Sequence, residues 1–166
     1  MAYTGTLIAQ LPSIINTMST IRNATADDLP ALVRLLGQLN EAPSPAPTQR
    51  HVAAFAAITA DPRQRLLVIE HDGVVIGTVA MIIVPNLGHN GTPYALVENV
   101  VVDERARGKR HGEALLRHII KEAQAAGCYK VALTSRKHRK DAHRFYERLG
   151  FDATSEGFRY TLIGDQ

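Results

Sequence analysis

The chain of 166 residues contains no tryptophan and only one cysteine, and aromatic residues account for 5% of it. Because Cys128 stands alone, an internal disulfide is excluded, and a reducing compartment such as the cytoplasm is expected. The scarcity of aromatic side chains argues against a protein that stacks nucleic-acid bases on its surface. No apolar run approaches the roughly 18 residues that cross a bilayer, so we expect no membrane association.

Positive charge is present in modest excess and is unevenly distributed. The formal net charge is +3, and the sequence pI is about 9.2. Basic residues gather in two clusters, at 105–110 (RARGKR) and 136–140 (RKHRK). This density is low for a dedicated nucleic-acid-binding domain, so nucleic acid is not the expected partner. An anionic ligand between the clusters and a pair of solvated loops are both compatible with the pattern.

Turn signals and hydrophobic periodicity divide the chain into strands and helices. Residues 1–17 are low in charge and show no clean period, so we interpret them as an N-terminal appendage to one domain over 18–166. The expected elements are a strand at 20–25, a helix that begins after Thr25, a helix at 49–60, two strands joined by a turn at 71–73, a strand at 94–103, a helix at 113–126, a strand at 128–135, a helix at 140–150, and closing strands at 151–156 and 158–164. This order predicts an α/β (α+β) domain with a central mixed, mostly antiparallel sheet and helices on both faces.

The first basic cluster lies between an apolar strand and a helix, in the stretch RARGKRHG. The first N–H groups of a helix have no intrahelical partner, and the helix dipole favours an anion there. Gly108 and Gly112 allow the backbone to approach such a ligand closely. The stretch matches neither the GxxxxGKS/T nor the GxGxxG phosphate-binding pattern, so the residues alone indicate a general anion site.

Three segments in order, VENVVVDERARGKRHGEALL, AGCYKVAL and AHRFYERLGF, resemble the GNAT superfamily of acyl-CoA-dependent N-acyltransferases. The pyrophosphate loop of that family has Arg or Gln, two residues, Gly, one residue, and Gly or Ala. Arg107 and Gly112 match the first and last positions, whereas Arg110 stands where the family has the middle Gly. Arg139 stands where the family often has Asn, seven residues before a tyrosine that corresponds to Tyr146.

The resemblance implies acetyl-CoA as a co-substrate. No metal is expected, because the histidines lack carboxylate or Cys companions at ligand spacing. The resemblance places the pantetheine beside the strand at 100–102, where backbone groups would pair with it as with an added strand. It places the pyrophosphate on the N–H groups of 108–113, with Arg107 and Lys109 nearest the phosphates. A solvated surface is the alternative for Lys109, Arg110 and the cluster at 136–140. The implied cofactor residues are Val100, Val101, Val102, Arg107, Gly108, Lys109, Arg110, His111, Gly112 and Glu113.

Glu98 and Tyr146 are the candidates for proton transfer. Acetylation of an amine requires its neutral form, although an alkyl ammonium has a pKa near ~10.4. Glu98 lies on a strand expected to be covered on both faces, where a carboxylate is costly unless it is used or paired. We interpret Glu98 as the base, acting through water. The alternative is that Glu98 is a structural partner for an Arg or for a backbone donor. Tyr146 matches the tyrosine that the family often uses as general acid toward the CoA thiolate, with a core aromatic residue as the alternative.

The acceptor is indicated only by local resemblance. Parts of the chain resemble glucosamine-6-phosphate and aminoalkylphosphonate N-acetyltransferases, which implies a small amine that carries an anionic group. The prediction is therefore transfer of an acetyl group from acetyl-CoA to a primary amine of a small molecule, by direct attack in a ternary complex. A non-catalytic CoA-sensing or nucleic-acid-binding regulatory module is the alternative, and a homodimer stays open.

Overall fold

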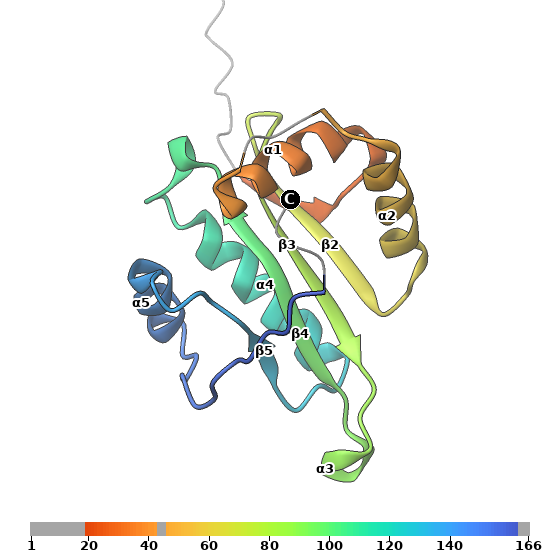
Figure 1. Cartoon of the computed structure of the whole chain (residues 1–166), viewed down its shortest axis with the longest axis vertical. Coiled ribbons are helices and arrows are strands. Elements are labelled where there is room, and N and C mark those ends of the chain that lie inside the picture. Colours follow the sequence, from red (N-terminus) through yellow and green to blue (C-terminus); the bar gives the residue numbers. More distant parts are fainter. Residues whose placement is uncertain (1–18, 43–45, 163–166) are drawn as a thin grey trace, which may run out of the picture.

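A five-stranded sheet forms the centre of the molecule, and its strands lie side by side in chain order (Figure 1). The computed structural model describes residues 19–42 and 46–162, so the predicted appendage at 1–17 lies outside the described residues. Three neighbouring strand pairs are antiparallel and the last pair is parallel, which confirms the predicted mixed, mostly antiparallel sheet. The strands are β1 (Thr20–Asn23), β2 (Gln64–His71), β3 (Val74–Val84), β4 (Tyr94–Val102) and β5 (Val131–Leu133).

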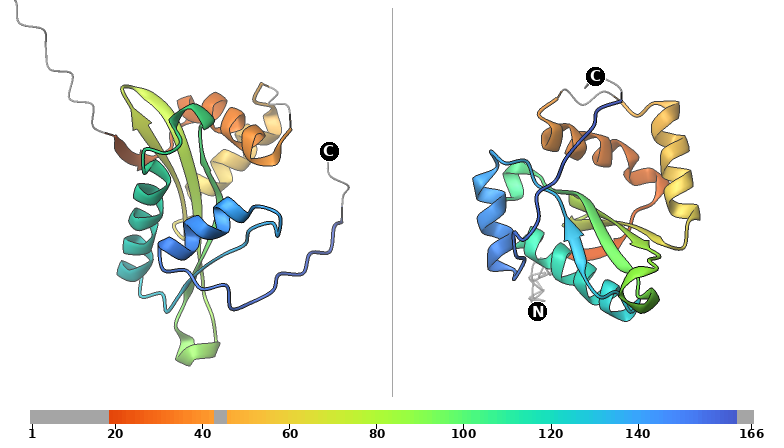
Figure 2. Two further views of the ribbon diagram at one scale, coloured as in Figure 1. Left: turned by 90° about the vertical axis from the view of Figure 1, so that its left-hand side faces the viewer. Right: turned by 60° about the horizontal axis from the view of Figure 1, so that its bottom comes forward.

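Helices cover both faces of the sheet, as the sequence predicts (Figure 2). Helices α1 and α2 lie over one face, and α4 packs on the other. Helix α4 begins two residues earlier than expected. The longer helices are α1 (Leu29–Asn40), α2 (Gln49–Ala60), α4 (His111–Ala125) and α5 (Lys140–Arg148), and the short turns are η1 (Ala26–Asp28), α3 (Gly88–Gly91) and η2 (Glu104–Ala106).

The side chains of β2 alternate between two apolar cores, one on each face of the sheet. Leu67 and Ile69 belong to the core beneath α4, together with Leu115 of that helix. Val68, between them, belongs to the core beneath α1, together with Leu35. Both faces of the central strands are therefore buried, as the apolar runs in the sequence predict.

An ionic network ties β1 and β2 to the start of α1. Thr25 and Asp28 form the predicted capping box. Arg22 on β1 pairs with Asp28 at 2.7 Å and with Glu70 on β2 at 2.8 Å. The hydrogen bond from Arg22 is the main reason that the pKa of Asp28 falls to about 2, so this carboxylate stays charged over the physiological range.

Two strand predictions in the C-terminal half are wrong, and a third is correct only in part. The strand expected at 128–135 is reduced to β5, and Cys128 lies half-buried before it. The closing strands expected at 151–156 and 158–164 are absent as far as residue 162, where the description of this end stops. A strand requires a partner for its backbone hydrogen bonds, and β5 offers only three residues at the edge of the sheet. Residues 152–162, the C-terminal tail, therefore run as an exposed extended chain that stands away from the sheet (Figure 2).

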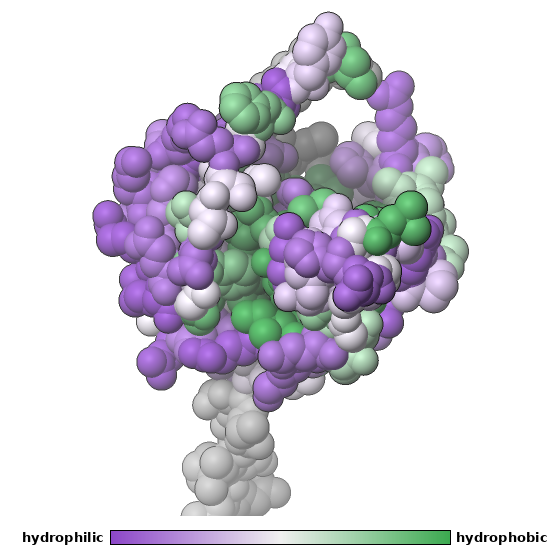
Figure 3. Space-filling model, turned by 90° about the horizontal axis from the view of Figure 1, so that it is seen from below, coloured by the Kyte–Doolittle hydropathy of each residue, from purple (hydrophilic) through white to green (hydrophobic). Residues whose placement is uncertain are grey.

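Exposed apolar side chains include those of a hollow on one face and those along the C-terminal tail. One face of the molecule has a hollow lined by hydrophobic side chains and bordered by hydrophilic ones (Figure 3). Phe158, Tyr160 and Leu162 alternate along the C-terminal tail and are 94%, 88% and 88% exposed. Across residues 19–42 and 46–162, no helix has the length and apolar character needed to cross a membrane.

Candidate functional site

Strand β4 contains a bulge at its middle. Val79 of β3 opposes two residues of β4, Asn99 and Val100. Asn99 has a φ of 57°, a left-handed conformation that Asn tolerates better than most residues. The extra residue reverses the alternation of side chains, so that Val97 lies in the core beneath α4 and Val101 in the core beneath α1.

Strands β4 and β5 separate at this bulge. Their pairing ends with Val97 opposite Leu133. From Glu98 onward, the edge of β4 that faces β5 has no strand partner within the described ranges. At the far end of this edge, the carbonyl oxygen of Val102 accepts a hydrogen bond from Nε of Arg107 at 3.2 Å. The open edge exposes backbone groups that an extended ligand can pair with.

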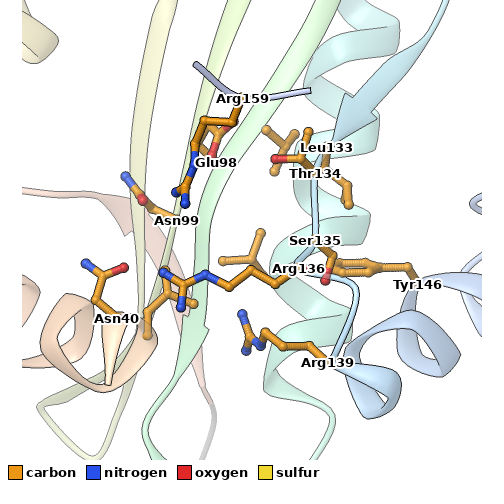
Figure 4. Close-up of a pocket in the computed structure, with 13 residues that line it drawn as sticks. Asn40, Glu98, Asn99, Leu133, Thr134, Ser135, Arg136, Arg139, Tyr146 and Arg159 are labelled. Atoms are coloured by element: carbon orange, nitrogen blue, oxygen red, sulfur yellow. The ribbon is translucent and has the colours of Figure 1, made fainter. Parts of the chain in front are cut away.

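Two cavities lie along the open edge and meet at Tyr146. The larger cavity, of about 660 Å³, is bounded by β4, the loop at 106–110, the start of α4 and helix α5. The smaller cavity, of about 240 Å³, is bounded by the end of α1, β4, the segment after β5 and the C-terminal tail (Figure 4). Val100, Arg139 and Tyr146 line both cavities.

The larger cavity brings together the predicted cofactor residues. All of them line it except Lys109, which is exposed and lies outside the lining. The free N–H groups of α4 begin at this cavity, because His111 is the first residue of the helix. Cationic side chains outnumber anionic ones in the lining, which contains Arg107, Arg110, Arg117, Arg139 and Arg148 beside Glu113 and Asp141.

Two glycines of the loop have different structural roles. Gly108 has a φ of 79°, and a Cβ added there would meet no atom within 4 Å, so backbone conformation favours glycine at this position. A Cβ on Gly112 would lie 3.3 Å from the ring of Phe145 and 3.6 Å from the side chain of Val102. Gly112 therefore allows α4 to pack closely on α5 and β4, and it also lines the larger cavity.

Tyr146 extends from α5 towards the place where the cavities meet (Figure 4). Its ring centroid lies 5.3 Å from that of Phe145 and 5.9 Å from that of Phe151. Burial raises the pKa of Tyr146, Glu98 adds to the increase, and Arg139 opposes it. The phenol consequently keeps its proton at neutral pH and is able to donate it.

Glu98 is exposed on the open side of β4, at the smaller cavity. The expectation that a covered strand makes this carboxylate costly is wrong, because β4 has lost its neighbour at that point. Asn99 and Asn40 line the same cavity. A solvated carboxylate beside a polar cavity retains its charge cheaply, and water has access to it.

His111 lies beside the loop, close to Ser19 and His71. The hydroxyl oxygen of Ser19 lies 3.1 Å from Nδ1 of His71 and 3.4 Å from Nδ1 of His111. Burial lowers the pKa of His111, and the charges of His71 and Lys109 act in the same direction. His111 is therefore neutral at pH 7, and the group it offers an anion is its backbone N–H.

Three arginines line the smaller cavity, and two of them belong to the second basic cluster. Arg136 follows β5 and Arg139 precedes α5. Arg136 lines the smaller cavity and not the larger one, so it does not lie among the predicted cofactor residues. Arg159 comes from the C-terminal tail and was not predicted. In the sequence, the feature that could have indicated this role is the position of Arg159 between Phe158 and Tyr160. In an extended chain, that position places a lone cation on the side opposite the apolar side chains.

The sequence of residues 29–151 matches the family model for the acetyltransferase (GNAT) family. The chain belongs to the GNAT family. The match covers most of the chain, from α1 through α5, and it confirms the resemblance seen in the three sequence segments.

Relatives of this GNAT protein match over most of their own length. It is 31% identical to a glucosamine 6-phosphate N-acetyltransferase of Trypanosoma brucei brucei, over 86% of this chain and 95% of that protein. It is 29% identical to an aminoalkylphosphonate N-acetyltransferase of Salmonella typhimurium, over 85% of this chain and 88% of that protein. Among solved structures, a putative acetyltransferase from Agrobacterium tumefaciens superposes with a TM-score of 0.80 and 39% identity, covering 86% of this chain and 99% of that one.

The departures of this GNAT chain from the family pattern have structural consequences. Arg110, in place of Gly, has a φ of 63° and is the N-cap residue of α4. A left-handed conformation costs a residue with a Cβ roughly 1–2 kcal/mol, so the turn is retained at some expense in stability. Arg139, in place of Asn, puts a cation where the two cavities meet.

Proposed function

We propose that this GNAT acetyltransferase holds acetyl-CoA in the larger cavity and transfers the acetyl group to a primary amine of a small molecule in the smaller cavity. The observation that carries the proposal is the shared lining of Val100, Arg139 and Tyr146. A donor and an acceptor bound together would meet at this lining, which favours direct attack in a ternary complex. Cys128 lines neither cavity, so it is not positioned to carry the acetyl group.

The residues of the larger cavity fit the chemistry of coenzyme A. Free N–H groups at the start of α4, together with Arg107 and Arg110, suit a pyrophosphate. The open edge of β4 from Glu98 to Val102 suits the amide groups of a pantetheine arm. Acetyl-CoA supplies the acetyl thioester, and the protein supplies orientation and proton transfer.

We assign the two proton transfers to Glu98 and Tyr146. Glu98 accepts the proton of the acceptor ammonium through water, since its carboxylate is exposed beside the smaller cavity. A backbone N–H of β4 near Val100 donates a hydrogen bond to the thioester carbonyl oxygen, where negative charge develops. The neutral amine nitrogen attacks the thioester carbon, and as the carbon–sulfur bond breaks, Tyr146 donates its phenolic proton to the departing sulfur. The new amide nitrogen loses its extra proton to water, and the Tyr146 phenolate regains a proton from water.

The acceptor, the compartment and the assembly are further parts of the proposal. Two relatives are named for glucosamine 6-phosphate and for aminoalkylphosphonates, so we propose an amine that also carries an anionic group. A reducing compartment such as the cytoplasm suits a chain whose one cysteine is a free thiol. The alternating apolar side chains of the C-terminal tail suit a homodimer in which the partner covers them.

Ligand-dependent stability and turnover test this function. Acetyl-CoA at a hundredfold excess over its Kd should raise the free energy of unfolding by about 2.7 kcal/mol. Arg107→Gln should weaken acetyl-CoA binding, whereas Lys109→Gln, two residues away and outside the cavity, should not. Release of free CoA thiol with a panel of amines measures turnover. No stabilisation by any acyl-CoA would contradict the proposal, and stabilisation without thiol release would favour the CoA-sensing alternative.

A further inference from the structure

The lining of the smaller cavity contains an excess of positive charge. Arg136, Arg139 and Arg159 line it, and Glu98 is the single carboxylate in the lining. Within residues 19–42 and 46–162, none of the three guanidinium groups forms a salt bridge with a carboxylate. Most other arginines near the site are paired, as Arg107 is with Glu104 and Arg117 with Glu113.

The three arginines converge on one space from separate parts of the chain. Arg136 comes from the segment after β5, Arg139 from the residue before α5, and Arg159 from the C-terminal tail (Figure 4). Like charges held around one small volume repel one another, so an empty cavity is electrostatically unfavourable. A bound anion removes that repulsion, and a guanidinium matches the geometry of a multi-oxygen anion with paired hydrogen bonds.

Neutral polar groups accompany the cations. Asn40, Asn99 and Thr134 line the cavity. Ser135 also lines it, and its hydroxyl oxygen is buried without a hydrogen-bond partner in the part of the chain that the structure describes. A volume of about 240 Å³ lies below the usual range for drug-sized ligands, so the cavity suits a small polar molecule.

We propose that Arg136 and Arg159 bind a phosphoryl or phosphonyl group of the acceptor amine and thereby determine its specificity. Arg139 also lines the larger cavity. We therefore assign it to the place where the acceptor and acetyl-CoA meet, and not to the phosphoryl or phosphonyl group. The acceptor then carries both charges that the lining requires, an ammonium for Glu98 and a dianion for the arginines. A dianion with three terminal oxygens satisfies two guanidinium groups, which a monoanionic carboxylate with two oxygens does less well. This inference rests on the proposed acetyl transfer at the same site.

Acceptor pairs that differ only in the anion provide the test. Glucosamine 6-phosphate is compared with glucosamine, and 2-aminoethylphosphonate with ethanolamine and β-alanine, which distinguishes a phosphate monoester from a phosphonate. We expect at least one phosphorus-containing acceptor to exceed its counterparts in kcat/KM by about 100-fold or more, as expected for charge-assisted hydrogen bonds. Equal kcat/KM for each phosphorus-containing acceptor and its counterparts would overturn the inference while leaving acetyl transfer intact.

Variants locate the effect in the two arginines. Arg136→Gln and Arg159→Gln should each raise the acceptor KM by about 10-fold or more, with the KM for acetyl-CoA changed less than twofold. The preference for the phosphorylated acceptor should fall in the same variants. Lys137→Gln is the matched control, because Lys137 is an exposed neighbour that lines neither cavity. An unchanged acceptor KM in both arginine variants would contradict the assignment.

Binding of inorganic phosphate separates the two hypotheses. With the larger cavity saturated by CoA, calorimetry should detect phosphate binding to the wild-type protein and weaker binding to both arginine variants. If no amine is acetylated but this pattern holds, acetyl transfer fails and the anion subsite stands. If amines are acetylated but phosphate binds equally to wild type and variants, the subsite fails and acetyl transfer stands.

Discussion

Tyr146 gains its chemical role from its surroundings more than from its own reactivity. Two aromatic rings hold it, both cavities reach it, and burial raises its pKa. A phenol in this state is a poor base and is available as a proton donor next to a developing thiolate. Phe145, its neighbour on α5, supplies the packing against Gly112, so the two aromatic residues have separate tasks.

Tyr146→Phe removes the hydroxyl and retains the ring. The fold and the KM for acetyl-CoA should change little, because the packing partners remain. The loss in kcat should be about 10²–10⁴-fold, the usual contribution of general acid catalysis. Steady-state kinetics together with a single-turnover measurement would check this, the latter to ensure that chemistry limits the rate. Retention of more than half of the wild-type kcat would indicate that water supplies the proton.

Glu98→Gln tests the base. Glu98 is exposed, so the substitution should leave the melting temperature nearly unchanged, and any loss of activity is chemical. We expect a lower kcat at neutral pH that recovers partly at high pH, where more of the amine is already neutral. A pH–rate profile of the variant parallel to that of the wild type would assign Glu98 a structural role.

Helix α4 and its loop form the element that presents backbone N–H groups to the larger cavity. Asp103 accepts a hydrogen bond from the N–H of Arg105 at 3.1 Å and pairs with Arg34 of α1, which fixes the start of the loop. Gly108 and Arg110 then turn the chain in left-handed conformations before His111 begins the helix. The turn before α4 therefore includes one unfavourable backbone conformation, at Arg110.

Arg110→Gly should relieve that cost. The free energy of unfolding should rise by roughly 1 kcal/mol, because the exposed pair between Arg110 and Glu113 at 3.4 Å contributes little. Acetyl-CoA affinity should fall modestly, since a cation of the larger cavity is lost. Urea unfolding measures the first effect and calorimetry the second. Lys109→Gly is the control, because Lys109 lacks a positive φ and its replacement should not stabilise the protein.

At the scale of the whole molecule, the C-terminal tail is the part that a single copy leaves unsatisfied. Phe158 and Tyr160 are exposed on either side of Arg159, which lines the smaller cavity. If a partner subunit covers them, Phe158→Ser with Tyr160→Ser should convert a dimer to a monomer without loss of helical circular dichroism. Analytical ultracentrifugation would measure this, and a monomeric wild-type protein would exclude the homodimer.

Local signals in the sequence were sufficient for much of this architecture. The capping box at Thr25, the turn after His71 and the loop before α4 each depend on residues adjacent in the chain, and the structure contains all three. The tail at 151–162 could not be predicted in the same way, because an alternating apolar pattern describes a strand only if a partner strand exists. Arg159 was missed for the same reason, since its place in the smaller cavity depends on the path of the tail.

The bulge in β4 makes the length of this strand, and not only its composition, a requirement of the site. Deleting Asn99 would remove the bulge and leave the side chains of Val100, Val101 and Val102 on the faces where they now lie, because the extra residue is what reverses the alternation. Val101 would stay in the core beneath α1, and β4 would regain the regular pairing with β3 that the bulge now interrupts. Replacement of Asn99 by Gly or Asp preserves the bulge, because both residues tolerate a positive φ. We therefore expect this segment to tolerate such substitutions but not the loss of the residue, because the bulge lies where β4 separates from β5 and the site opens.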